Sequence, residues 1–170
     1  DGDRIGVIDS TGRILWGDQL LTILAREVLE DVPGAPVLCD VKASRLFFDE
    51  IHNLGGVPVM WKSGHSHIKS KMKEINAPLA GEMSAHIFFK HRYYGFDDAL
   101  YAAIRLLSLI SMNPKNLAEK IDCLPKYVNT PELRFFCEDD RKFSVVEEIR
   151  SRLSNIKGIE PKILRINQNK

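Results

Sequence analysis

The sequence centres on Gly81-Glu82-Met83-Ser84-Ala85-His86, a polar loop between two apolar runs at residues 77–80 and 87–89. The glycine at its start leaves the backbone free to turn. Outward from these runs, helical patterns alternate with short apolar stretches along most of the chain. Such alternation is typical of α/β proteins, in which helices cover both faces of a sheet. We therefore predict a three-layer α/β fold.

The loop itself carries groups suited to binding hydroxyls. In an extended segment Glu82, Ser84 and His86 would all point to the same side. A carboxylate accepts hydrogen bonds from two neighbouring hydroxyls, and a serine hydroxyl adds a donor or acceptor beside it. His86 is placed to move a proton there. The pattern suggests a surface loop that binds a vicinal diol, such as that of a sugar ring, although a solvated connection is the commoner role of such a loop.

The surrounding elements follow from hydrophobic spacing, capping residues and turn chemistry. We expect a hairpin from residues 5–8 and 14–16, strands at 36–41 and 57–61, and helices at 18–30, 44–54, 66–75 and 99–111, with a short helix from Pro114 to about Leu124. Asp18 is expected to cap the first helix. The helix at 99–111 is apolar nearly all round, so we expect it to be well buried.

One domain is predicted over residues 14–125, and the chain changes character after it. Residues 125–140 contain two prolines and little periodicity, as a linker would. A helix at 141–153 and a strand at 161–166 then suggest the opening of a further domain. The chain starts without a methionine, in the middle of a polar motif, so we expect it to be a piece of a longer protein.

Composition excludes several classes of function. The net charge is +1, which gives no nucleic-acid footprint and no polybasic membrane patch. The apolar runs are far shorter than the ~20 residues that span a bilayer. Three cysteines are scattered without paired spacing, which suggests reduced thiols in a cytoplasmic protein. We therefore expect neither nucleic acid nor a membrane as a partner.

Further polar residues stand at the ends of the predicted elements. Asp1 and Asp3 could offer oxygen ligands to Mg²⁺, and Arg4 beside them suits a phosphate. Lys42 follows a strand, where partial burial would let it take part in proton transfer, and His65 lies in a strand-to-helix loop. Without context, a solvated turn and surface side chains are the commoner outcome for these residues.

A zinc site is a rival interpretation. His65 and His67, with His86 and His91, supply imidazoles, but no pair among them has firm ligand spacing. We do not favour this interpretation.

Six stretches, taken in order, resemble the α-D-phosphohexomutase family, in particular its bacterial phosphomannomutase/phosphoglucomutase branch. Each stretch alone is weak, and their order makes the resemblance specific. They are Asp1-Gly2-Asp3-Arg4-Ile5-Gly6, Trp16-Gly17-Asp18-Gln19, Asp40-Val41-Lys42, Trp61-Lys62-Ser63-Gly64-His65-Ser66, Gly81-Glu82-Met83-Ser84-Ala85-His86 and Arg92-Tyr93-Tyr94-Gly95-Phe96-Asp97-Asp98.

The resemblance implies a four-domain protein. Residues 1–13 would end the second, metal-loop domain, and residues 14–125 would form the third, an α/β sandwich with a mixed sheet. Residues 126–170 would be a linker and the incomplete start of the fourth domain. The family moves a phosphoryl group between the 1- and 6-positions of a hexose, through a phosphoserine and a bisphosphorylated sugar. The implied ligands are mannose or glucose 1- and 6-phosphates and hexose 1,6-bisphosphate.

The resemblance also implies roles for individual residues. Two aspartates would bind Mg²⁺, an arginine beside them would belong to the active site, and a lysine and two histidines would serve or flank acid–base chemistry. Two loops would bind the substrate. The implied metal ligands are Asp1 and Asp3, the catalytic residues are Arg4, Lys42, His65 and His86, and the substrate-binding residues are Lys62, Glu82 and Ser84.

Some family features are missing from this sequence. The loop with the catalytic serine and the first metal aspartate are absent, so we expect the chain by itself to be inactive and to hold Mg²⁺ poorly. Ala85 stands where the family commonly has glycine, which affects the backbone angle of the loop. A non-catalytic sugar-phosphate-binding module is the alternative to a piece of an enzyme.

Overall fold

The computed structural model describes residues 1–128, 133 and 135–156, which divide into two compact units. The first unit covers residues 1–127, and residues 1–13 belong to it by their contacts. Their assignment to a preceding domain stays a prediction. The second unit begins at Val128, and its one named helix is α6 (Lys142–Ser154), close to the predicted 141–153. The predicted strand at 161–166 lies outside the described residues.

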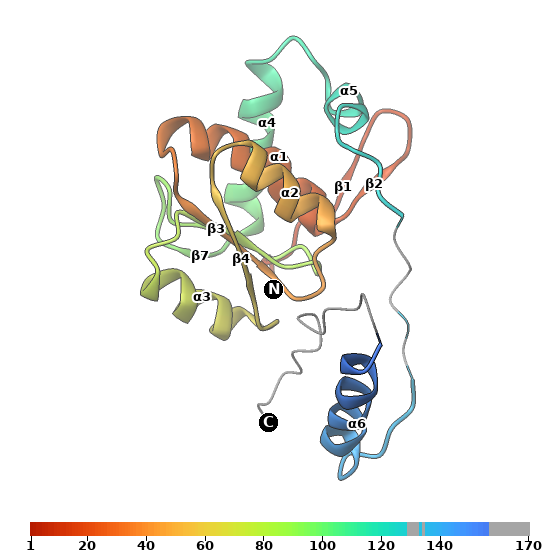
Figure 1. Ribbon diagram of the computed structural model, residues 1–170. Helices are drawn as coiled ribbons and strands as arrows, with labels where there is room; N and C mark the ends of the chain where they lie inside the picture. Colours follow the sequence, from red (N-terminus) through yellow and green to blue (C-terminus); the bar gives the residue numbers. More distant parts are fainter. Residues whose placement is uncertain (129–132, 134, 157–170) are drawn as a thin grey trace. The chain divides into compact units, whose positions relative to one another are not determined.

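A five-stranded mixed sheet forms the centre of the first unit (Figure 1). Its spatial order is β4-β3-β5-β6-β7. The first three of these are mutually parallel, and the last two are antiparallel to their neighbours, which confirms the predicted mixed sheet. The strands are β3 (Pro36–Asp40), β4 (Val57–Trp61), β5 (Leu79–Gly81), β6 (Ile87–Phe89) and β7 (Phe96–Asp97).

Helices cover both faces of this sheet, so the predicted three-layer α/β fold is confirmed (Figure 1). Successive strand residues point to opposite faces. Val37 and Cys39 pack in the larger core, with α1, α2 and α4, whereas Leu38 packs in the smaller core with α3. The helices are α1 (Gly17–Asp31), α2 (Arg45–Asn53), α3 (His65–Glu74), α4 (Ala99–Ser111) and α5 (Leu117–Asp122).

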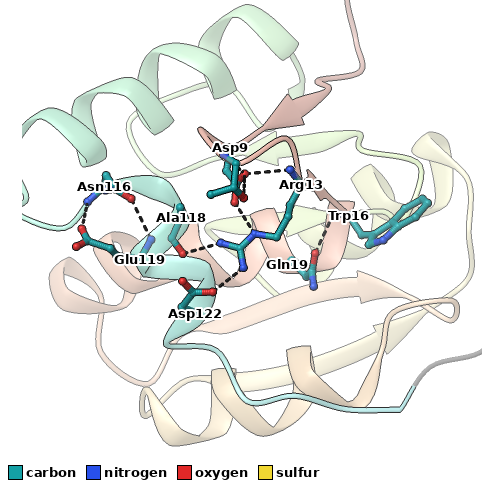
Figure 2. A network of polar contacts seen from close by, with 9 residues as sticks. Asp9, Arg13, Trp16, Gln19, Asn116, Ala118, Glu119 and Asp122 are labelled. Carbon is teal, nitrogen blue, oxygen red and sulfur yellow. Dashed lines mark hydrogen bonds and ion pairs between the residues drawn. The ribbon is translucent and has the colours of Figure 1, made fainter.

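The predicted hairpin, β1 (Val7–Ile8) and β2 (Ile14–Leu15), is tied to α5 by a polar network (Figure 2). Arg13 donates from Nε to Asp9 Oδ2 at 2.7 Å and from Nη2 to the carbonyl oxygen of Ala118 at 3.1 Å, and its Nη1 forms an ion pair with Asp122. Burial alone would raise the pKa of Asp9, but hydrogen bonds from Thr11 and Arg13 hold that pKa well below its usual range. Asp9 therefore stays ionised and orients Arg13, which bonds the hairpin to α5.

The burial predicted for the helix at 99–111 is wrong, although its bounds are correct. Ala102 and Leu106 are buried against the sheet, but Leu100, Ile104 and Leu107 are 76%, 64% and 66% exposed. The reason is that α4 packs on the sheet with one face only, and no described residue covers the other. Within the described residues, no helix is long and apolar enough to cross a membrane.

The start of the first helix also differs from expectation. The helix begins at Gly17 with Trp16 as N-cap, so Asp18 lies in the first turn and does not cap it. The buried Asp18 carboxylate instead accepts the backbone N–H of Ser44 at 2.8 Å. It thereby joins the start of α1 to the loop that leads into α2. The short helix expected from Pro114 begins only at Leu117, after the N-cap Asn116.

Candidate functional site

The site residues gather where the parallel strands β3, β4 and β5 end. From β3 the chain passes through α2 to β4 on one side, and then crosses through α3 to β5 on the other side. The loop after β3 leads to α2 on one face of the sheet, and the loop after β4 leads to α3 on the other face. Open α/β sheets bind ligands at such a switch point.

Asp40, the last residue of β3, fixes the two neighbouring loops at this edge. Its buried carboxylate accepts the Ser63 hydroxyl at Oδ2, 2.7 Å away, and the backbone N–H of Met83 at Oδ1, 3.0 Å away. Sequence reasoning did not select Asp40 as a site residue. Its position at the end of a buried strand, two residues before the candidate lysine, is the signal that could have found it.

The loop after β5 is a tight turn and not an extended segment, so the predicted alternation is wrong. Ala85 N–H donates to the Glu82 carbonyl and Glu82 N–H donates to the His86 carbonyl, both at 2.9 Å. As a result Ser84 is exposed at the tip of the turn, whereas Glu82 and His86 are buried. The expectation of a surface loop holds only for that tip.

Ala85 has a φ of +67°, in the left-handed region that disfavours residues with a Cβ. We predict that Ala85→Gly raises the free energy of unfolding by about 0.5–1 kcal/mol, because relief of strain outweighs the greater freedom of glycine in the unfolded chain. Urea unfolding measures this. Ala43→Gly, at a position with ordinary φ, should instead lower stability. A loss of stability in Ala85→Gly would contradict the inference that the backbone at Ala85 is strained.

Glu82 links the turn to the loop before α3. Its Oε1 accepts the backbone N–H of Gly64, the N-cap of α3, at 2.5 Å. The positive end of the helix dipole favours a carboxylate there. Gly64 itself has a φ of +118°, which glycine adopts without steric cost. The carboxylate predicted to bind a diol thus also holds the loop containing Lys62.

His86 is the point at which the N-terminal segment meets the turn. Its Nε2 accepts a hydrogen bond from Arg4 Nε at 3.0 Å, and its Nδ1 lies 2.9 Å from Asp97 Oδ2 and 3.7 Å from Asp3 Oδ2. Arg4 and His86 also form a backbone bridge, and Ile5 N–H donates to the Ala85 carbonyl at 3.1 Å. Asp3 and Arg4 from the first motif are therefore brought together with His86 from the loop after β5.

Asp97 was not selected from the sequence. It reaches His86 because β7 pairs with β6, where Asp97 is opposite Phe88. Burial alone would raise the pKa of Asp97, but hydrogen bonds from its own backbone N–H and from Lys69 Nζ keep that pKa below its usual value. The available signal was a carboxylate just after an aromatic turn. That His86 is its partner became evident only from the register of β7 against β6.

The remaining candidates lie at the same edge but are more open. Lys42 is exposed on the loop after β3, and Lys62 is half-buried after β4. His65 is exposed at the start of α3, with its ring 6.4 Å from the ring of His86. Asp1 is exposed at the first residue of the chain.

The histidines of the zinc interpretation do not gather. His91 lies 3.0 Å from Asp31, at the C-terminal end of α1. Among the described residues, the metal-capable group of His, Cys, Asp and Glu side chains is Asp3, His86 and Asp97, which includes one of the four histidines. The structure therefore gives no support to a site made of these four residues.

Fold and site together define an α/β/α domain with a carboxylate and a paired histidine at its switch point. The family described as "Phosphoglucomutase/phosphomannomutase, alpha/beta/alpha domain III" matches residues 16–127. The chain belongs to this family, as the resemblance implied.

Relatives and solved structures agree with this assignment. The chain is 45% identical over 150 residues to the phosphomannomutase/phosphoglucomutase of Pseudomonas aeruginosa, covering 88% of this chain and 32% of that protein. It is 45% identical over 153 residues to the phosphoglucomutase of Neisseria gonorrhoeae, covering 89% of this chain and 33% of that protein. A phosphoglucomutase/phosphomannomutase family structure from Burkholderia thailandensis matches with a TM-score of 0.81 and 42% identity, over 89% of this chain and 31% of that one. The chain thus spans about a third of the length of these relatives.

Proposed function

We propose that this chain is the sugar-binding part of a cytoplasmic phosphomannomutase/phosphoglucomutase. The full-length protein would move a phosphoryl group between the 1- and 6-positions of mannose or glucose phosphates, through a phosphoserine and a hexose 1,6-bisphosphate. The observation that carries this proposal is the convergence of Glu82 and the Arg4–His86 pair at the switch point of a family domain III. The scattered, unpaired cysteines support the cytoplasmic location.

The side chains divide into two chemical groups. His86 exchanges a proton with a sugar hydroxyl, with Lys42 and His65 in supporting positions at the same edge, and Arg4 attracts the phosphate charge. Glu82 and Ser84 bind ring hydroxyls, and Lys62 adds positive charge beside them. Phosphoryl transfer is accelerated mainly by alignment and charge stabilisation, which such a set supplies.

We propose Mg²⁺ as the metal of the full-length protein, with Asp1 and Asp3 among its ligands. Both residues fit in donor type, since Mg²⁺ prefers carboxylate oxygens, and both side chains retain access to solvent. Asp3 Oδ2 lies near the His86 ring, so the ion would place its charge beside the acid–base group. When bound, it would neutralise charge on the phosphoryl oxygens. Because the resemblance assigns only two of the family's metal aspartates to this sequence, we expect this chain alone to bind Mg²⁺ weakly.

Glu82→Gln in the full-length protein tests the sugar-binding role. Hydrogen bonds to charged groups contribute roughly 1.5–3 kcal/mol, so we expect kcat/KM for hexose 1-phosphates to fall about ten- to a hundredfold. Some loss of stability should accompany it, because an amide oxygen is a weaker acceptor for the Gly64 N–H. A coupled assay for hexose 6-phosphate, with a thermal melt, measures both.

Glu50→Gln is the matched control. Glu50 lies on α2 and is also a buried carboxylate, and it accepts a hydrogen bond from Arg26 at 3.1 Å. It should lower stability and leave kcat/KM unchanged. Wild-type kcat/KM in Glu82→Gln would end the sugar-binding assignment. A full-length protein that binds hexose phosphates without turnover would favour the alternative, a non-catalytic binding module.

A further inference from the structure

We propose that Asp97 is a positioning residue that holds His86 in the Nδ1–H tautomer and so reserves Nε2 for exchange of a proton with the substrate hydroxyl. This inference rests on the proposed function. The structural observations that carry it concern the two ring nitrogens of His86 and the groups opposite each of them.

The group facing Nδ1 is an acceptor. Asp97 Oδ2 lies 2.9 Å from Nδ1, and the side chains of Asp97 and His86 are only 9% and 6% exposed. An ionised carboxylate accepts hydrogen bonds but cannot donate them, so the proton of the pair must sit on Nδ1. Asp3 Oδ2 is also near Nδ1, but at 3.7 Å it is beyond hydrogen-bonding distance.

The group facing Nε2 is a donor. Arg4 Nε–H points to Nε2 at 3.0 Å, and a guanidinium in a protein has donors only. Nε2 therefore presents its lone pair, and the two neighbours require the same tautomer of neutral His86. A substrate hydroxyl that replaces the exposed Arg4 at Nε2 would meet that lone pair directly.

The position of Asp97 is fixed by two other elements. Its backbone is held by the pairing of β7 with β6, opposite Phe88, whose ring stacks on His86 with centroids 6.2 Å apart. Its Oδ1 forms an ion pair with Lys69 Nζ of α3 at 3.3 Å. Asp97 is therefore held where it can orient the His86 ring, as the aspartate of a catalytic triad orients its histidine.

The first test is the tautomer in this chain, measured by long-range ¹H–¹⁵N correlation spectra of ¹⁵N-histidine-labelled protein. Signals that vanish in His86→Asn identify the ring. We expect a protonated Nδ1 in the wild type and a shift towards the Nε2–H form in Asp97→Ala. Asp3→Asn, the control, should keep the wild-type tautomer. An unchanged Nδ1–H form in Asp97→Ala, or an Nε2–H form in the wild type, would overturn the proposal.

The second test is kinetic, in the full-length protein. Asp97→Ala should lower kcat about ten- to a hundredfold with little change in KM, because the hydroxyl still binds but meets a misoriented ring. Asp31→Asn removes a comparable carboxylate–histidine pair, at His91, and should leave kcat unchanged. If Asp97→Ala fails to fold, the isosteric Asp97→Asn takes its place and should shift the tautomer in the same direction, since its amide can turn NH₂ towards the ring.

The two claims fail separately. A wild-type kcat in Asp97→Ala, in an active full-length protein, overturns the positioning role. If the full-length protein has no mutase activity, the proposed function fails, and the tautomer measurement still decides whether Asp97 orients His86.

Discussion

His86→Asn in the full-length protein should lower kcat by about 10²–10⁴-fold, the range typical for loss of a general acid–base group. Asparagine can keep a hydrogen bond to Asp97, but it has no titratable nitrogen at the position of Nε2. Binding of the phosphate should persist, since Arg4 and the lysines of the site are untouched. Steady-state kinetics with saturating hexose 1-phosphate measures the change, and circular dichroism checks the fold.

The matched control is His52→Asn, because His52 is exposed on α2 and has no place in the proposed site. It should retain wild-type kcat. If His86→Asn also keeps full kcat, the acid–base role of His86 is refuted, and Lys42 and His65 become the remaining candidates.

Gly17→Ala should destabilise the protein by about 1–3 kcal/mol and lower its melting temperature by roughly 4–12 °C. A Cβ at residue 17 would lie 2.2 Å from the Glu82 carbonyl oxygen and 3.0 Å from Ala85 N and the Met83 carbonyl oxygen. All three are backbone atoms, so the clash cannot be relieved by rotating a side chain. The start of α1 or the turn at residues 82–86 has to move.

Gly6→Ala provides the comparison, since a Cβ there meets no atom within 4 Å and its φ is not in the left-handed region. The melting temperatures of the two variants should therefore differ by nearly the whole decrease expected for Gly17→Ala. Equal melting temperatures would mean that the contact between α1 and the turn is loose. In the full-length protein, Gly17→Ala should also lower kcat/KM, because Glu82 and His86 lie at the two ends of the displaced turn.

The sheet and its helices followed from the sequence because each depends on local spacing. Three of the strands, β3, β4 and β6, coincide with apolar runs in the sequence. The bounds of α4 were predicted without error. The burial of α4 was not predictable in the same way. Composition cannot tell which side of an apolar helix meets the sheet, and here Leu100, Ile104 and Leu107 face away from it.

The candidate site was predictable only in part, for a similar reason. Glu82 and His86 were found because they flank a turn in a recognisable motif. The shape of that turn was missed, because period-two reasoning assumes an extended backbone. The glycine that the family commonly has at the position of Ala85 was the one local signal of the positive φ. Asp40 and Asp97 act through partners 43 and 11 residues away in the chain, which strand pairing alone brings into contact.

The hairpin-to-α5 network has a mechanical consequence for any longer chain. Asp9 and Arg13 lie near the entry of the first unit, whereas Ala118 and Asp122 lie near its exit. Because these two segments are bonded to each other through Arg13, a displacement of α5 is passed to the hairpin. The hairpin follows closely on Arg4 and Ile5, which are bonded to His86 and Ala85, so such a displacement has a short path to the turn that holds Glu82 and His86.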